Sequence, residues 1–160
     1  MAEVQVVQAQ PEDIPAWLEL AREVEPLFGP MVEDPGFHRA LKKNIARGTA
    51  YCVRVGGQPA GAPMRGGLLF SPKPPEYEVA WLAVTETHRR GGVGRALMEH
   101  ALAHVTPPAT ISLTTFGPDN PAGEPARRFY EKFGFQPAES APDGPEGGSR
   151  QVYRLELGHL

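Results

Sequence analysis

The amino-acid sequence predicts an α/β fold in which a mixed, largely antiparallel central sheet is flanked by helices. Runs rich in β-forming residues alternate along the chain with segments whose apolar residues recur at helical spacing. Glycine and proline, with 18 residues each, cluster between these segments, where they predict turns and loops. The 160 residues, 41% of them hydrophobic, suffice for one core, so we expect a single domain over residues 1–160.

The first part of the chain is predicted to form one strand and two helices. We expect the strand at residues 4–8 and the helices at 12–25 and 35–47. Proline does not continue a helix and glycine commonly follows one, so Pro26 is expected to end the first helix and Gly48 the second.

Strands dominate the middle of the chain. Three runs separated by turns that contain glycine and proline predict an antiparallel meander at residues 49–55, 61–70 and 77–84. A helix is expected at 92–105, where apolar residues return to helical spacing before two consecutive prolines.

The last part of the chain completes the sheet. A strand is expected at 111–116, a helix at 126–133, and two closing strands at 135–138 and 151–157. The predicted order of elements is therefore β-α-α-β-β-β-α-β-α-β-β. Residues 141–148, rich in glycine and proline, are expected to form the tip of a hairpin.

Charge and composition exclude several classes of protein. The formal net charge of −3 argues against a nucleic-acid partner, because nonspecific binding to phosphates needs an excess of lysine and arginine. No apolar run approaches the length of a membrane span and residues 1–7 lack the pattern of a signal peptide, so we expect a cytoplasmic protein with no membrane partner. Cys52 is the only cysteine, which excludes disulfides within the chain and favours a small buried strand residue.

The stretch HRRGGVGRAL, residues 88–97, follows a buried strand and opens a helix. The first N–H groups of a helix have no partner inside it, the helix dipole adds partial positive charge, and glycines let the backbone approach phosphate oxygens closely. Arg89 and Arg95 add guanidinium groups on either side of the turn. The turn therefore predicts a pyrophosphate site.

Other readings of this turn remain open. A P-loop needs Lys-Ser or Lys-Thr after its last glycine, whereas Arg95 and Ala96 stand here. A dinucleotide-binding oxidoreductase needs a third glycine near Leu97 and normally carries the motif in its first βαβ unit. A turn that only joins a strand to a helix is the third alternative.

The spacing Arg89-x-x-Gly92-x-Gly94, after a strand that ends in LAV at 82–84, resembles the acyl-CoA signature of the GNAT superfamily, the Gcn5-related N-acetyltransferases. Downstream, FYEKFGF at 129–135 is similar to the second marker of that family, a helix with a tyrosine followed by a Gly-Phe turn into a strand. The predicted order of elements also matches the family over nearly the whole chain.

The resemblance implies acetyl-CoA as the cosubstrate and no metal ion. Two neighbouring strands, 77–84 and 111–116, are expected to splay apart beside the turn so that the pantetheine arm inserts between them. The cosubstrate residues that it implies are Leu82 and Val84 for the arm, and Arg89, Gly91, Gly92, Val93, Gly94 and Arg95 for the phosphates.

The activity implied is transfer of the acetyl group of acetyl-CoA to a primary amine, by direct attack in a ternary complex. Tyr130 matches the proton donor of the family, and a backbone N–H near Val84 is expected to hold the oxyanion. Glu78 is the candidate base, because we expect it to share strand parity with Leu82 and Val84; Glu76 or a water chain is the alternative. A CoA-binding sensor or scaffold without catalysis is the rival function.

One departure from the family lies before the tyrosine. Many members carry an asparagine seven residues earlier, where this chain has Gly123, while Asn120 lies ten residues before Tyr130. We expect either that Asn120 folds back onto the cosubstrate from a lengthened loop at 117–125 or that this contact is absent.

The amine acceptor is expected to be a small molecule or a protein N-terminus or lysine. By position in this fold, its pocket is predicted between the first two helices, with Phe28, Met31 and Phe37 as an apolar wall and Glu33 or Asp34 to attract a cationic amine. Sheet edges in this fold often pair between subunits, which allows a homodimer.

Two pairs of basic residues on helices are expected to bind neither a metal ion nor the cosubstrate. His100 and His104 have the four-residue spacing of a zinc site, but Ala101 stands where the metalloprotease pattern has glutamate, so a solvated or partly packed helix face is expected. Arg127 and Arg128 are expected to face solvent rather than the adenosine phosphate.

Overall fold

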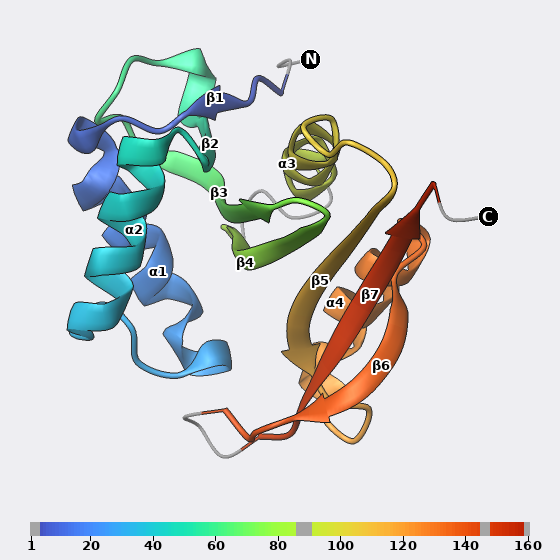
Figure 1. Cartoon of the computed structure of the whole chain (residues 1–160). Coiled ribbons are helices and arrows are strands. Elements are labelled where there is room, and N and C mark those ends of the chain that lie inside the picture. The colour runs from blue at the N-terminus through green and yellow to red at the C-terminus, as the bar shows by residue number, and fades with distance from the viewer. Residues whose placement is uncertain (1–3, 86–90, 145–147, 159–160) are drawn as a thin grey trace.

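The computed structural model describes residues 4–85, 91–144 and 148–158 and has the predicted α/β fold class. The elements in chain order are β1 Val7–Gln8, α1 Ile14–Phe28, α2 Pro35–Arg47, β2 Ala50–Arg54, β3 Met64–Lys73, β4 Glu76–Val84, α3 Val93–Leu102, β5 Ala109–Phe116, α4 Glu124–Lys132, β6 Gln136–Ala141 and β7 Arg150–Leu157, with 3-10 turns at Pro11–Asp13, Val55–Gly57 and Pro121–Gly123. The described strands form one seven-stranded sheet in the order β1-β2-β3-β4-β5-β7-β6 (Figure 1). Every neighbouring pair is antiparallel except β4 and β5, which run parallel.

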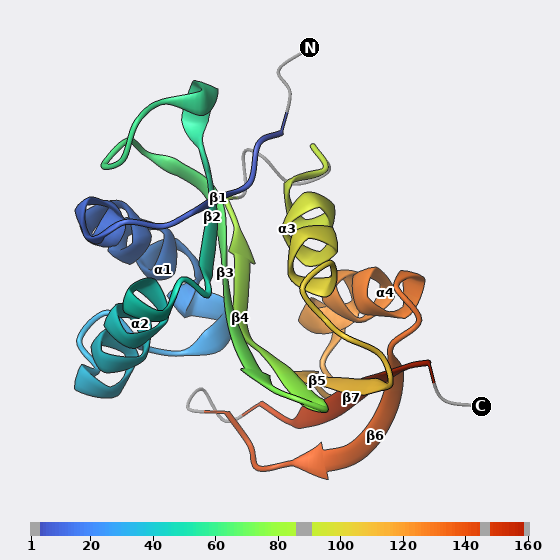
Figure 2. The ribbon, with the colours of Figure 1, turned by 45° about the horizontal axis from the view of Figure 1, so that its top comes forward.

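The helices cover both faces of the sheet (Figure 2). Helices α1 and α2 pack on one face, against the strands of the first half, and α3 and α4 lie on the other face. A buried cluster fills each interface: Trp17 and Leu41 belong to the first, and Leu97, Ile111 and Phe135 to the second. No helix in the described part of the chain is long and apolar enough to cross a membrane.

Helix α1 continues past Pro26 to Phe28, so the prediction that Pro26 ends this helix is wrong. Proline removes one hydrogen bond to the preceding turn, but little more than half a turn follows Pro26 and the loss stays local. The helix ends instead at Gly29, whose φ of 91° breaks the helical path and whose N–H donates to the Glu25 carbonyl at 2.8 Å. Helix α2 has its predicted bounds, with Gly48 in the left-handed conformation at its end.

The predicted meander of β2, β3 and β4 is confirmed, with shifted bounds. The strand expected at 61–70 occupies Met64–Lys73, because Gly61 is held in the preceding loop: its N–H donates to Asp13 Oδ1 at 2.9 Å. The strand expected at 4–8 pairs only over Val7–Gln8. Part of the expected hairpin tip, residues 145–147, lies outside the described residues.

Asp13 is a buried carboxylate that joins three segments of the first half. Arg54 of β2 donates to it through Nε and Nη2 at 3.0 and 2.8 Å, and Gln10 and Gly61 donate backbone N–H groups. Burial alone raises the pKa of Asp13, but these four hydrogen bonds outweigh burial and the net shift is downward. The start of α1 is thereby fixed to the sheet.

Candidate functional site

The two parallel strands at the centre of the sheet separate toward their C-terminal ends. Pairing between β4 and β5 is confined to residues 76–78 of β4 and 110–112 of β5. Beyond that point β4 remains paired with β3, and β5 with β7, so the sheet has a V-shaped break between 79–84 and 113–116 (Figure 1). We call this break the β4–β5 opening. It confirms the splay that the family resemblance implied.

The backbone of β4 presents hydrogen-bonding groups to the opening. Thr85 donates its N–H to the Arg65 carbonyl of β3 at 2.9 Å, so this residue faces β3. Because neighbouring residues of a strand direct their N–H and C=O groups to opposite sides, Leu82 and Val84 face the opening. Such groups favour an extended chain that pairs with them, as a peptide pairs with an exposed sheet edge.

The glycine turn lies at the wide end of the opening, where β4 leads into α3. Gly92 caps α3 with a φ of 83°, and the first bond of the helix runs from Ala96 N–H to the Gly92 carbonyl at 3.0 Å. The N–H groups of Val93, Gly94 and Arg95 therefore precede the internal ladder of the helix. A Cβ built on Gly92 would meet no atom of the described residues within 4 Å.

The charged neighbours of this turn are only partly described. Arg95 is exposed and forms a long i,i+4 pair with Glu99 at 3.6 Å, which leaves its guanidinium able to turn to a ligand. Arg89 lies outside the described residues.

Helix α4 packs against the same turn. A Cβ on Gly94 would lie 3.4 Å from the ring of Phe129 and 3.5 Å from Val84 Cγ2, so helix, turn and strand meet closely there. Tyr130 is half-buried beside the rings of Phe129 and Phe135, and burial raises its pKa to about 12. Its hydroxyl therefore stays protonated at neutral pH and can donate a proton or a hydrogen bond.

Glu78 lies on the opposite face of β4 from Leu82 and Val84, so the predicted parity is wrong. Its neighbour Val79 is buried in the cluster beneath α3, and Leu82 and Val84 pack against that same cluster. The cause is a β-bulge: Ala80 has no counterpart on β3, and an extra residue shifts the alternation of side chains by one. Glu78 is exposed and points to the face that carries α1 and α2.

Gly123 leaves no room for the asparagine that many family members carry at this place. A Cβ on Gly123 would lie 2.2 Å from Phe116 Cβ, far inside contact distance. Asn120 does not replace it in this structure, because its Oδ1 accepts the N–H of Ala122 at 3.1 Å and caps the 3-10 turn before α4. To fold back onto a cosubstrate, as expected, Asn120 would thus have to give up this capping hydrogen bond.

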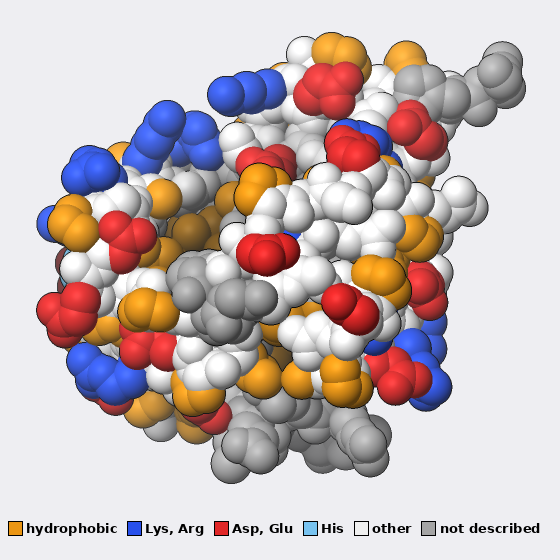
Figure 3. Space-filling model, turned by 90° about the horizontal axis from the view of Figure 1, so that it is seen from below, with side chains coloured by type: hydrophobic (Ala, Val, Ile, Leu, Met, Phe, Trp, Pro, Cys, Tyr) orange, Lys and Arg blue, Asp and Glu red, His pale blue; other side chains and the backbone are white. Residues whose placement is uncertain are grey.

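Aromatic side chains gather beside the β4–β5 opening on the face of the sheet that carries α1 and α2. The rings of Phe28, at the end of α1, and Phe116, at the end of β5, stack with centroids 5.1 Å apart. The Arg150 guanidinium lies 4.7 Å from the centroid of the Phe116 ring, and Phe37 of α2 packs on Trp81 of β4. Seen from below, the surface of the molecule has a hollow in which hydrophobic side chains are visible (Figure 3).

The connection between α1 and α2 is held by hydrogen bonds to acidic residues. The Glu25 carboxylate accepts the N–H groups of Met31 and Val32 at 2.8 and 2.9 Å, which lowers the pKa of Glu25. Of the two acidic residues expected to attract an amine, Asp34 caps α2 by accepting the Gly36 N–H, while Glu33 is exposed.

Two further expectations have clear outcomes. Cys52 is buried, as predicted, and burial raises the pKa of its thiol to about 12. His100 and His104 pack against Tyr51, with ring centroids 4.6 and 5.6 Å from it, which confirms a partly packed helix face. Within the described ranges, no three residues of the usual metal-ligating types are grouped to hold an ion.

The expectation that Arg127 and Arg128 face solvent holds for one of them. Arg128 is 72% exposed in an ion pair with Glu124. Arg127 is part-buried, and its Nη1 donates to the carbonyls of Gly117 and Asn120. The sequence gave no indication of this contact, because both partners are backbone atoms of a loop.

Comparisons with known proteins agree with this geometry. The family model described as the acetyltransferase (GNAT) domain matches residues 46–137. Ard1 from Thermoplasma volcanium is similar in structure with a TM-score of 0.76, at 19% identity over 99% of this chain and 100% of its own. The ribosomal-protein-S18-alanine N-acetyltransferase from Escherichia coli has a TM-score of 0.73 at 18% identity, over 99% of this chain and 96% of its own.

A third similar structure contains a ligand. Arabidopsis thaliana Naa50, in complex with the bisubstrate analogue CoA-Ac-MVNAL, has a TM-score of 0.73 at 18% identity, over 96% of this chain and 99% of its own. At such identities, the solved structures define the class of fold, that of the GNAT acetyltransferases. Because the family model covers more than half of the residues, this chain belongs to the GNAT acetyltransferase family.

Proposed function

We propose that this chain is an N-acetyltransferase that transfers the acetyl group of acetyl-CoA to a primary amine. One observation carries the proposal: among the described residues, the edge of β4 beyond residue 78 has no strand partner on the β5 side, and Val84 at its end lies against Gly94 of the glycine turn that opens α3. An extended arm that ends in a diphosphate needs strand-like partners along its length and N–H donors at its end, and this arrangement offers both in line.

The residues that would hold acetyl-CoA follow from this arrangement. Leu82 and Val84 offer backbone N–H and C=O groups to the pantetheine arm. The turn residues Gly91, Gly92, Val93, Gly94 and Arg95 would bind the phosphates, together with Arg89. The left-handed conformation of Gly92 supports this fit, because a residue without a side chain lets the backbone approach an anion closely. Asn120 would join them only by leaving its capping bond.

When bound, acetyl-CoA supplies a thioester whose acetyl carbon is open to attack by a neutral amine in a ternary complex. Tyr130, kept protonated by burial, would give its proton to the departing sulfur. A backbone N–H of β4 near Val84 would stabilise the oxyanion. Glu78 would remove the proton of the amine, directly or through water, and its place on the face away from α3 suits an acceptor that arrives from that side.

The acceptor would enter from the face where Phe28 stacks on Phe116, and a hollow in which hydrophobic side chains are visible opens on the surface seen from below (Figure 3). A peptide or protein N-terminus is one candidate acceptor, because two of the similar structures are of the ribosomal-protein-S18-alanine N-acetyltransferase and of a complex with the bisubstrate analogue CoA-Ac-MVNAL. A small-molecule amine or a lysine would reach the same hollow.

Thiol release in the presence of acetyl-CoA and a panel of amines and peptides tests the function. With an accepted amine, Tyr130→Phe should lower kcat by about a hundredfold, while acetyl-CoA still raises the melting temperature of the variant. A CoA-binding sensor would instead show the thermal shift with no thiol release from either protein. Stabilisation by NAD in place of acetyl-CoA would favour an oxidoreductase and overturn the proposal.

A further inference from the structure

Helix α4 carries the proposed acid but is held by little burial of its own. None of the residues of Glu124–Lys132 is fully buried, and Phe129, Tyr130 and Phe133 are only partly buried against the cluster beneath α3. A helix of nine residues is also too short to be stable by itself. Its position must therefore depend on specific contacts to the rest of the molecule.

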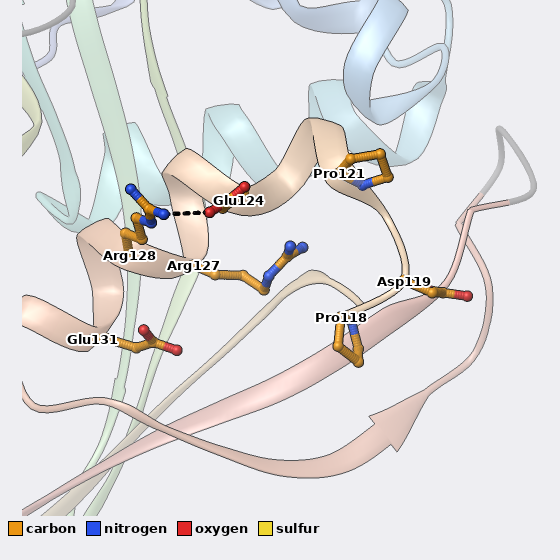
Figure 4. Close-up of a pocket in the computed structure, with 7 residues that line it drawn as sticks. All are labelled: Pro118, Asp119, Pro121, Glu124, Arg127, Arg128 and Glu131. Carbon is orange, nitrogen blue, oxygen red and sulfur yellow. Dashed lines mark hydrogen bonds and ion pairs between the residues drawn. The ribbon is translucent and has the colours of Figure 1, made fainter.

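Arg127 supplies such a contact. Its side chain leaves α4 and points toward the connection between β5 and α4, over a shallow pocket lined by Pro118, Asp119 and Pro121 (Figure 4). There Nη1 donates to the Gly117 carbonyl at 2.7 Å and to the Asn120 carbonyl at 2.9 Å. Hydrogen bonds from a charged donor are stronger than neutral ones, and these two are part-buried.

The loop between β5 and α4, which accepts the hydrogen bonds of Arg127, is itself packed tightly on the sheet. Gly117 donates its N–H to the Ser149 carbonyl at 2.9 Å, next to the start of β7. A Cβ on Gly117 would lie 2.1 Å from Ser149 Oγ, and one on Gly123 would lie 2.2 Å from Phe116 Cβ. One guanidinium thus ties the helix to a segment that is fixed against β5 and the edge of β7.

Glu131, one turn further along the helix, interacts with β7. Tyr153 of β7 is buried, and burial and then the charge of the Glu131 carboxylate raise the pKa of its hydroxyl, while the charge of Arg127 lowers it. At helical spacing, Arg127 and Glu131 lie on the side of α4 opposite to Phe129, which packs against Gly94 of the glycine turn.

We propose that Arg127 is a positioning residue for the transfer reaction, which holds α4 in the place where Tyr130 reaches the departing sulfur. This inference rests on the proposed function of Tyr130 as the acid. Arg127 acts through the carbonyls of Gly117 and Asn120.

The test uses the full chain and a double-mutant cycle with Tyr130. Arg127→Met keeps most of the stem and removes the donors, and Arg128→Met is the matched control, because the neighbouring arginine is 72% exposed in an i,i+4 pair. Arg127→Met should lower kcat about tenfold, since small misplacements of a reacting group have large effects. The KM for acetyl-CoA should stay within about twofold, because uniform binding is unchanged, and Arg128→Met should behave as wild type.

The decisive measurement is the effect of Arg127→Met in the Tyr130→Phe background. If Arg127 acts by placing the Tyr130 hydroxyl, then removing that hydroxyl removes the effect, and the double variant has the kcat of Tyr130→Phe alone. An equal loss in both backgrounds would show general disruption and overturn the inference, and so would an unchanged kcat in Arg127→Met. If Tyr130→Phe by itself retained full activity, the proposed acid would fail first, which distinguishes the two failures.

Arg127→Lys keeps the inference testable if the methionine variant does not fold. An ammonium retains a charged donor but loses the planar geometry of the guanidinium, so kcat should fall less than with methionine and again not at all in the Tyr130→Phe background. A lysine variant whose loss is the same in both backgrounds would overturn the inference.

Discussion

Gly123 occupies a position where the packing leaves no room for a side chain. Its Cα lies so close to Phe116 that any side chain would collide with the end of β5. The sequence alone identified the departure from the family pattern at this position, but not its cause. The contact joins residues of two separate elements, which no local pattern predicts.

Gly123→Ala should therefore destabilise the protein. We expect the free energy of unfolding to fall by about 1–3 kcal/mol, as is typical of overpacking in a tight site, because Phe116 must shift to admit the methyl group. Urea denaturation measures this change. Gly36→Ala is the control: its Cβ would meet no atom closer than an Asp34 side-chain oxygen at 3.3 Å. A Gly123→Ala variant as stable as wild type would show that the end of β5 is not packed as described.

The orientation of Glu78 depends on a β-bulge, which the sequence did not predict. Strict alternation along β4 places Glu78 with Leu82, and the bulge at Ala80 separates them. Strand bounds and apolar runs can be predicted from residue types, but a bulge arises from the register with the neighbouring strand. The bulge therefore places Glu78 on the face from which an acceptor would come.

Glu78→Gln should change the pH dependence of the rate. We expect kcat/KM to fall by roughly a hundredfold near neutral pH, where the acceptor amine is protonated and a base must act. The loss should shrink at high pH, where more of the amine is already neutral. Glu76→Gln is the comparison, since Glu76 is the alternative base. An unchanged pH–rate profile in Glu78→Gln would remove Glu78 from the mechanism.

At the scale of elements, the sequence predicted the helices and strands well and their ends less well. Helix α2 has its predicted bounds because Asp34 caps it and Gly48 follows it, and both signals are local. Helix α1 passed Pro26 because Gly29, and not the proline, takes the conformation that ends a helix. The beginning of β3 was displaced because Asp13, far away in sequence, holds Gly61 in a loop.

Asp13→Asn should loosen the attachment of α1 to the sheet. Asp13 is fully buried and the Arg54 side chain is 12% exposed, so the variant leaves a nearly buried guanidinium without its counter-charge. Breaking a buried pair in this way costs about 3–5 kcal/mol, and urea denaturation at neutral pH measures it. Glu19→Gln, in the exposed pair with Arg22, is the control and should leave the midpoint unchanged.

The Asp13–Arg54 pair also makes the free energy of unfolding depend on pH in the acidic range. Because the folded pKa of Asp13 lies below its ordinary value of 3.8, its stabilising contribution is present above that value and is lost as the pH falls through the folded pKa. Wild type should thus lose more stability than Asp13→Asn between neutral pH and strongly acidic pH. Parallel pH profiles for the two proteins would contradict the role given to this carboxylate.

At the scale of the whole molecule, the sheet consists of two halves joined over only three residue pairs. Composition, element order and the glycine turn were sufficient to predict the fold class, and the family resemblance supplied the separation of the strands. The contacts that cross between the halves, such as Phe28 on Phe116, were not predictable, since they depend on how separate elements are placed in space.

The most direct measurement is amide hydrogen exchange along β4 with and without acetyl-CoA. Leu82 and Val84 direct their N–H groups into the β4–β5 opening, whereas Ala83, opposite Gly67, faces β3. Saturating acetyl-CoA should slow exchange at Leu82 and Val84 at least about tenfold, with little change at Ala83, because new hydrogen bonds protect amides from solvent. Acetyl-CoA that leaves exchange at Leu82 and Val84 unchanged would contradict the account.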